Sequence, residues 1–84
     1  NIKIKFVSGA FEIPNLISRN LKKFDAFIAL GCIIKGETDH YYFISQSVTM
    51  GIMNLSIRSK KPIGFGILTC NNLKQAKYRS SLFM

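Results

Sequence analysis

The chain has 84 residues, enough for one small domain with a limited core. A composition of 48% hydrophobic residues, with seven Phe and three Tyr, excludes the charged, aromatic-poor class of disordered chains. The formal net charge of +8 would suit an anionic partner, but the basic residues are spread along the sequence without a dense block. Net charge alone would support nucleic-acid binding, so we expect no nucleic-acid partner.

The first predicted elements are a short strand and a short helix. Residues 2–6 alternate between apolar side chains and lysines, which is the period of a strand covered on one face, and this run ends near Gly9. A helix over residues 13–23 follows, because apolar residues recur there at helical spacing and Pro14 is tolerated in a first helical turn.

A second strand and a longer helix are predicted next. Residues 25–34 are almost continuously apolar, which is typical of a central parallel strand covered on both faces. A glycine turn leads from this strand to an amphipathic helix over residues 41–60, in which Gly51 is a possible point of close packing. The apolar stripe of this helix consists of Ile44, Val48, Ile52 and Leu55.

The last predicted elements are a strand over residues 63–69 and a helix that Asn71 or Asn72 could cap. Strands that alternate with helices predict right-handed crossovers and a parallel sheet with helices on its faces, so the predicted class is α/β. Ligands bind such sheets beyond the carboxyl ends of the strands. Three segments should emerge there: 9–12, 35–40 and 69–72.

The two cysteines, Cys32 and Cys70, have no metal-binding spacing, and the sequence contains a single histidine. We therefore expect no metal site and no disulfide framework, but buried free thiols in a reducing cytoplasm. No apolar run approaches the roughly 18 residues that a membrane span needs, so we expect no membrane partner.

His40 is the strongest candidate for chemistry, because histidine exchanges protons near neutral pH. It follows a polar turn and precedes a predicted helix N-terminus, where free backbone N–H groups and the helix dipole favour an anion such as phosphate. The alternative is a structural histidine after a turn in which Thr38 or Asp39 caps the helix.

Three further residues each allow two interpretations. Arg79, near the end of the last helix, is either a solvated cation or a residue whose planar guanidinium group binds a phosphate. Glu12 belongs either to a plain strand-to-helix turn or to a turn that accepts hydrogen bonds from a hydroxyl-rich ligand. Phe65, between two glycines, is either a core ring or an aromatic wall for a planar ligand.

Four segments, in order, resemble the successive motifs of the lumazine synthase family. They are SGAFEIP at 8–14, ALGCIIKGETDH at 29–40, FGILT at 65–69 and NLKQAKYR at 72–79. The resemblance implies a flavodoxin-like, three-layer α/β/α sandwich with a parallel sheet. It also implies that residues 1–84 form a single partial domain that lacks the first strand and helix and the last helix of the family.

The resemblance further implies an enzyme of riboflavin biosynthesis. Such an enzyme condenses 5-amino-6-(D-ribitylamino)uracil with 3,4-dihydroxy-2-butanone 4-phosphate to 6,7-dimethyl-8-ribityllumazine, with loss of phosphate and water and without a cofactor. The family assembles as homo-pentamers, sometimes as decamers or sixty-subunit capsids, with active sites between subunits. The alternative is a non-catalytic shell or scaffold module of the same fold.

By position, the resemblance assigns proton transfer to His40 and binding of the substrate phosphate to Glu37, Thr38 and Arg79. The residues that it implies at the ribityl chain are Ala10, Phe11 and Glu12. Those that it implies at the pyrimidine are Cys32, Ile33 and Ile34, with Phe65 contributed by a neighbouring subunit.

Overall fold

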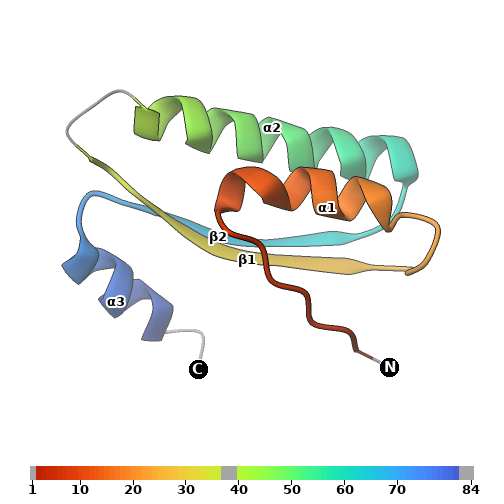
Figure 1. Cartoon of the computed structure of the whole chain (residues 1–84), viewed down its shortest axis with the longest axis horizontal. Coiled ribbons are helices and arrows are strands. Elements are labelled where there is room, and N and C mark those ends of the chain that lie inside the picture. The colour runs from red at the N-terminus through yellow and green to blue at the C-terminus, as the bar shows by residue number, and fades with distance from the viewer. Residues whose placement is uncertain (1, 37–39, 82–84) are drawn as a thin grey trace.

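The computed structural model describes residues 2–36 and 40–81 and contains two strands, three α-helices and one turn of 3-10 helix (Figure 1). In chain order these elements are η1 (Ala10–Glu12), α1 (Ile13–Arg19), β1 (Phe27–Ile34), α2 (His40–Ser59), β2 (Ile63–Cys70) and α3 (Leu73–Ser81).

The two strands are parallel and adjacent, with α2 as the crossover between them. Their register runs from Phe27 opposite Ile63 to Ile34 opposite Cys70. Helices α1 and α2 cover one face of this sheet, and α3 lies on the other, which gives three layers (Figure 1). The predicted α/β class with a parallel sheet is therefore confirmed.

The predicted first strand is wrong for the described residues. Residues 2–6 belong to no strand or helix, and the side chain of Phe6 is 91% exposed. A strand exists only where its backbone bonds to a neighbour, and β1 and β2 bond to each other. The alternating pattern describes a segment that could form a strand, but it does not provide the partner.

The prediction that the second strand is central and covered on both faces is also wrong in this structure. Among the described residues, β1 pairs with β2 alone. Its odd-numbered residues Ala29 and Ile33 are buried beneath α1 and α2, whereas Ile28 and Leu30, on the other face, are 77% and 69% exposed. The short helix α3 covers the carboxyl end of that second face and leaves the rest open (Figure 1).

The core lies between the sheet and the helices α1 and α2. Val48 and Ile52 of α2 are 1% and 3% exposed and pack against Ile17 of α1, Ile33 of β1 and Ile67 of β2. Each fully buried aliphatic side chain of this kind contributes about 1.5–3 kcal/mol. The predicted apolar stripe of α2 is thus confirmed, since the remaining two residues of the stripe are partly buried against the same cluster.

Gly51 is the predicted point of close packing, and the structure confirms it. A Cβ atom at this position would lie 3.1 Å from both Cβ and Cγ of Pro14. The absence of a side chain at Gly51 therefore allows α1 and α2 to approach each other closely.

The termini of the helices depend on side-chain hydrogen bonds. α1 ends four residues earlier than predicted, and Asn20 Nδ2 donates to the carbonyl oxygen of Leu16 at 2.7 Å where the chain turns away. At the start of α3, Asn72 Oδ1 accepts from the backbone N–H of Gln75 at 2.8 Å, while Gln75 Oε1 accepts from the N–H of Asn71 at 2.9 Å. Asn72, of the two predicted residues, is therefore the cap.

Candidate active site

The carboxyl ends of β1 and β2 form one edge of the sheet, at the left of Figure 1. The N–H of Lys35 donates to the carbonyl oxygen of Cys70 at 2.8 Å, so the two strands end together. α2 returns from this edge, beginning at His40, and α3 leaves it. Two of the three predicted loop segments therefore meet at one place, as parallel strands require.

His40 is the first residue of α2, and its side chain is exposed. The two phosphate-loop candidates before it, Glu37 and Thr38, lie outside the described residues. A positive charge lies close by, since Lys35 Nζ is 5.4 Å from the centroid of the Tyr42 ring in the first turn of α2. The beginning of α2 thus combines a proton-exchanging side chain, an ammonium group and the positive end of the helix dipole.

Arg79 lies in the last turn of α3, and its guanidinium group points back to the end of β2. Nη1 donates to the carbonyl oxygen of Thr69 at 2.9 Å and lies 4.0 Å from Cys70 Sγ. The side chain remains exposed. A guanidinium group has five N–H donors in a fixed plane, so an arginine held in this way can still present donors to an anion.

The segment from Cys32 to Ile34 does not present one surface. Successive residues of a strand point to opposite faces, and Ile33 is buried in the core beneath α1 and α2. Cys32 and Ile34 are on the opposite face and are exposed. The structure therefore brings Cys32 to the side of the sheet on which Arg79 lies and keeps Ile33 apart from it.

The residues implied at the ribityl chain form η1, which packs on β1 upstream of the edge. A Cβ atom at Gly31 would lie 3.8 Å from Cβ of Ala10. The N–H of Glu12 donates to the carbonyl oxygen of Gly9 at 3.1 Å, and the Glu12 side chain is exposed. Phe11 is exposed and lines a groove of about 520 Å³ between α1 and α2.

Phe65 lies apart from the other predicted site residues. It is opposite Ala29 in the sheet and five residues before the end of β2, a distance of about 17 Å along a strand. Its ring is 48% exposed, so it is not a core ring of this chain. Within a single chain, Phe65 and His40 are therefore not brought together.

The two thiols of this region differ in environment. Both cysteines are free, but only Cys70 is buried, so the expectation that both thiols are buried is wrong for Cys32. Desolvation and a hydrogen bond with Cys70 raise the pKa of Cys32, and the charge of Arg79 acts in the opposite direction. Cys32 is exposed because it lies on the sheet face that α3 covers only in part.

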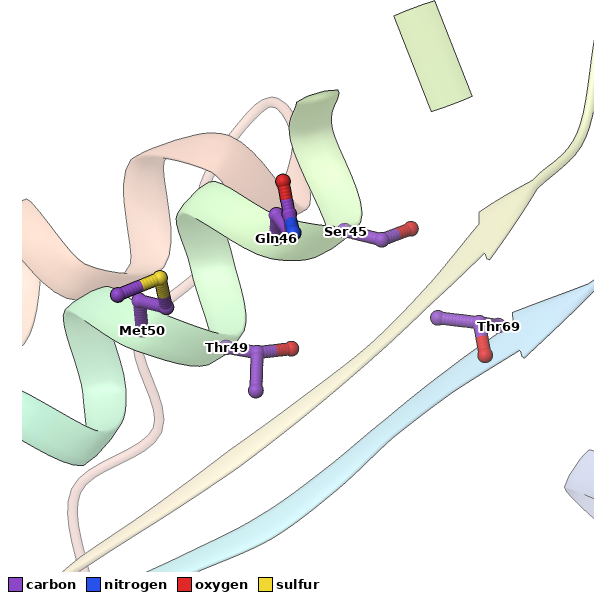
Figure 2. Close-up of a pocket in the computed structure, with 5 residues that line it drawn as sticks. All are labelled: Ser45, Gln46, Thr49, Met50 and Thr69. Atoms are coloured by element: carbon purple, nitrogen blue, oxygen red, sulfur yellow. The ribbon is translucent and has the colours of Figure 1, made fainter. Parts of the chain in front are cut away.

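A hollow that sequence reasoning missed lies beside the same strand end. It has a volume of about 350 Å³ and is lined by Ser45, Gln46, Thr49 and Met50 of α2 and by Thr69. Figure 2 shows Ser45 and Thr49 extending from α2 toward the strands, with Thr69 across from them. Ser45 Oγ is buried and has no hydrogen-bond partner among the described residues. The signal in the sequence was the spacing of two hydroxyl residues one helical turn apart.

Within residues 2–36 and 40–81, no group of three or more potential metal-ligating side chains is found. None of the helices in the same ranges has the length and apolar character that crossing a membrane requires.

The fold and this edge define a class: α/β proteins with a parallel sheet between helices, here with an arginine and a histidine at the carboxyl ends of the strands, where proteins of this class bind their ligands. Comparison with known proteins gives the particular family. The family model described as 6,7-dimethyl-8-ribityllumazine synthase matches residues 1–82. The chain belongs to this family, which confirms the resemblance seen in the four motifs.

Three curated relatives, each named 6,7-dimethyl-8-ribityllumazine synthase, illustrate the match. The chain is 49% identical to the protein of Limosilactobacillus reuteri over 84 residues, covering 98% of this chain and 55% of that protein. It is 51% identical to the Buchnera aphidicola protein, and this match covers 95% of the chain and 52% of that protein. It is 41% identical to the Renibacterium salmoninarum protein, and this match covers 95% of the chain and 50% of that protein. The chain thus spans about half the length of the curated relatives that it matches.

Proposed function

We propose that the protein carrying this sequence is a lumazine synthase of riboflavin biosynthesis. It would condense 5-amino-6-(D-ribitylamino)uracil with 3,4-dihydroxy-2-butanone 4-phosphate to 6,7-dimethyl-8-ribityllumazine. Family membership supports the activity. The observation that carries the site is the Arg79 guanidinium group, fixed by the Thr69 carbonyl at the sheet edge where His40 begins α2.

The proposed chemistry needs three things from the protein. The phosphorylated ketone needs an anion site, which the exposed guanidinium group of Arg79, the backbone of Glu37 and Thr38, and the dipole of α2 would supply. Attack of the amine on the ketone and elimination of phosphate both need proton transfer, which His40 would assist. Alignment of the two substrates would provide much of the rate, so His40 is a modest contributor.

The other residues would contact the pyrimidine and its side chain. Exposed polar groups of η1, with Glu12 foremost, would accept hydrogen bonds from the ribityl hydroxyls. The pyrimidine would lie along the segment from Cys32 to Ile34, where the buried Ile33 contributes its backbone. No organic cofactor or metal ion takes part in this proposal. The free thiols of Cys32 and Cys70 fit a reducing compartment, so we propose a cytoplasmic location.

The test is formation of the lumazine product by the wild-type protein and by single variants. Arg79→Ala should raise KM for the phosphorylated ketone about 10- to 100-fold, since it removes charge-assisted hydrogen bonds. His40→Ala should lower kcat by about 100-fold or less. Lys74→Ala is the matched control, because Lys74 is an exposed cation on the same helix as Arg79. Wild-type kinetics in both site variants would refute the roles.

We also propose that the protein is a homo-oligomer, with the pentamer as its basic unit. Four apolar side chains on the exposed side of α2 support self-association, since they recur at spacings of seven, three and four residues and are 57–69% exposed. They are Phe43, Met50, Met53 and Ile57. Assembly would also bring the half-exposed ring of Phe65 to a neighbouring site, which its own chain does not.

Light scattering tests the assembly. Met50→Glu and Met53→Glu should reduce the particle to smaller species, because each places a charge in the apolar stripe. Asn15→Glu is the control, because it adds the same charge at an exposed position of α1. Unchanged particle size in the two methionine variants would contradict the role of this stripe. An intact particle with neither turnover nor binding of the ribityl-uracil would instead support the alternative function, a non-catalytic shell or scaffold.

A further inference from the structure

The two cysteines lie on the same face of the sheet at neighbouring positions. Cys32 is opposite Leu68 in the register, and Cys70 follows Leu68 by two residues, so the two cysteines are diagonal neighbours across the β1–β2 pair. Cys70 is paired with Ile34, which lies on the same face of β1 as Cys32, so both side chains project from the side of the sheet on which α3 lies. Residues far apart in the sequence therefore form a dithiol, although the spacing of the cysteines gives no sign of it.

The pair combines an accessible thiol with a protected one. Cys32 is exposed to solvent, whereas Cys70 is 1% exposed beneath α3. A small oxidant can therefore reach Cys32 first, and Cys70 lies on the adjacent strand, where a small approach of the strand ends lets it react with the product. Arg79 Nη1 lies 4.0 Å from Cys70 Sγ. Desolvation raises the pKa of Cys32, and the positive charge of Arg79 acts against this rise by favouring the thiolate.

We infer that Cys32 and Cys70 form a redox-active pair that closes reversibly to an intramolecular disulfide between β1 and β2. The thiolate of Cys32 attacks a low-molecular-weight disulfide, forms a mixed disulfide and displaces one thiolate. The thiolate of Cys70 then attacks the Cys32 sulfur and displaces the second. The small disulfide takes up two electrons, and the two protons of the protein thiols pass to the two thiolates released.

The geometry indicates a labile bond. Adjacent strands lie about 4.8 Å apart and two residues span about 6.6 Å along a strand, so the Cα atoms of these diagonal neighbours are roughly 8 Å apart. This is more than the usual range for a disulfide, so the strand ends must approach. The main-chain bond from Lys35 to Cys70 resists this movement. Disulfides formed under strain are easily reduced, and this one should reopen when excess reduced glutathione is added.

Mass spectrometry of the intact chain after incubation with oxidised glutathione tests the inference. The wild-type protein should lose two hydrogen atoms and carry no glutathione, and proteolysis should yield a cross-linked peptide containing Cys32 and Cys70. Cys70→Ala should stop at one stable glutathione adduct on Cys32. Cys32→Ala should react far more slowly than either, because the remaining thiol is buried.

Three results would overturn the inference: a wild-type protein that stops at the mixed disulfide, one that forms only intermolecular cross-links, or one whose thiols both stay free while Cys70→Ala is modified. If Cys70→Ala does not fold, peptide mapping of the wild-type protein decides alone. A glutathione adduct on Cys32 without the cross-linked peptide, or two unmodified cysteines, then refutes the inference.

Discussion

Replacing Gly51 with alanine should destabilise the protein, although alanine is the better helix former. In the interior of a helix this change is worth about 1 kcal/mol in favour of alanine. Here, however, the new Cβ would lie 3.1 Å from two carbon atoms of Pro14, where carbon atoms prefer about 3.5–4.0 Å. The proline ring cannot rotate away, so α1 must move from α2 and loosen the packing of the core cluster to which Ile17 and Val48 belong.

Overpacking of this kind costs about 1–3 kcal/mol, so the net expectation is a loss of about 1 kcal/mol in the free energy of unfolding. Urea unfolding, followed by circular dichroism as a measure of helix content, detects the loss as a lower midpoint with an unchanged slope. Asn54→Ala, at an exposed position of the same helix, isolates the propensity effect and should stabilise by a few tenths of a kcal/mol. If Gly51→Ala stabilises the protein by about 1 kcal/mol, the packing argument is refuted.

Three other changes give further tests. Val48→Ala should lower the free energy of unfolding by about 2–3 kcal/mol, because its side chain is 1% exposed, and a urea-measured loss below about 0.5 kcal/mol would contradict its place in the core. Asn72→Ala should cost about 1 kcal/mol in the same assay through loss of the hydrogen bond to the N–H of Gln75, whereas an unchanged midpoint would mean that the cap contributes nothing. Alkylation of Cys32 should reach half its maximal rate at a pH above that of a free thiol, since desolvation raises its pKa. Arg79→Gln should shift this pH further upward, because the positive charge favours the thiolate, and a downward shift would contradict that assignment.

The elements that could be predicted from the sequence are those whose signal is local. The apolar stripe of α2 specifies the helix and its buried side at once, and the cap at Asn72 follows from an amide side chain before a helical segment. The first strand could not be predicted in this way, since residues 2–6 carry the right alternation but pairing depends on a neighbouring strand that periodicity cannot identify.

The same distinction between local and non-local signals applies to the candidate site. The position of His40 at a helix start was predictable because strand, turn and helix follow one another directly. The bond between Arg79 and the Thr69 carbonyl and the diagonal placement of Cys32 and Cys70 involve separate elements, so they depend on register and on the placement of α3. Family resemblance suggested roles for such residues but did not indicate which of them touch.

The constant register of the sheet has a consequence for the rate of folding. Residue 27 pairs with residue 63 and residue 34 with residue 70, so each pair joins positions 36 residues apart, and no pairing can start from a local hairpin. The entropy of closing this loop must be lost before any strand contact forms. Early formation of α2, which occupies 20 of the intervening residues, would shorten the flexible part of the loop. We therefore expect substitutions that weaken α2 to slow folding, even where they lie far from the sheet.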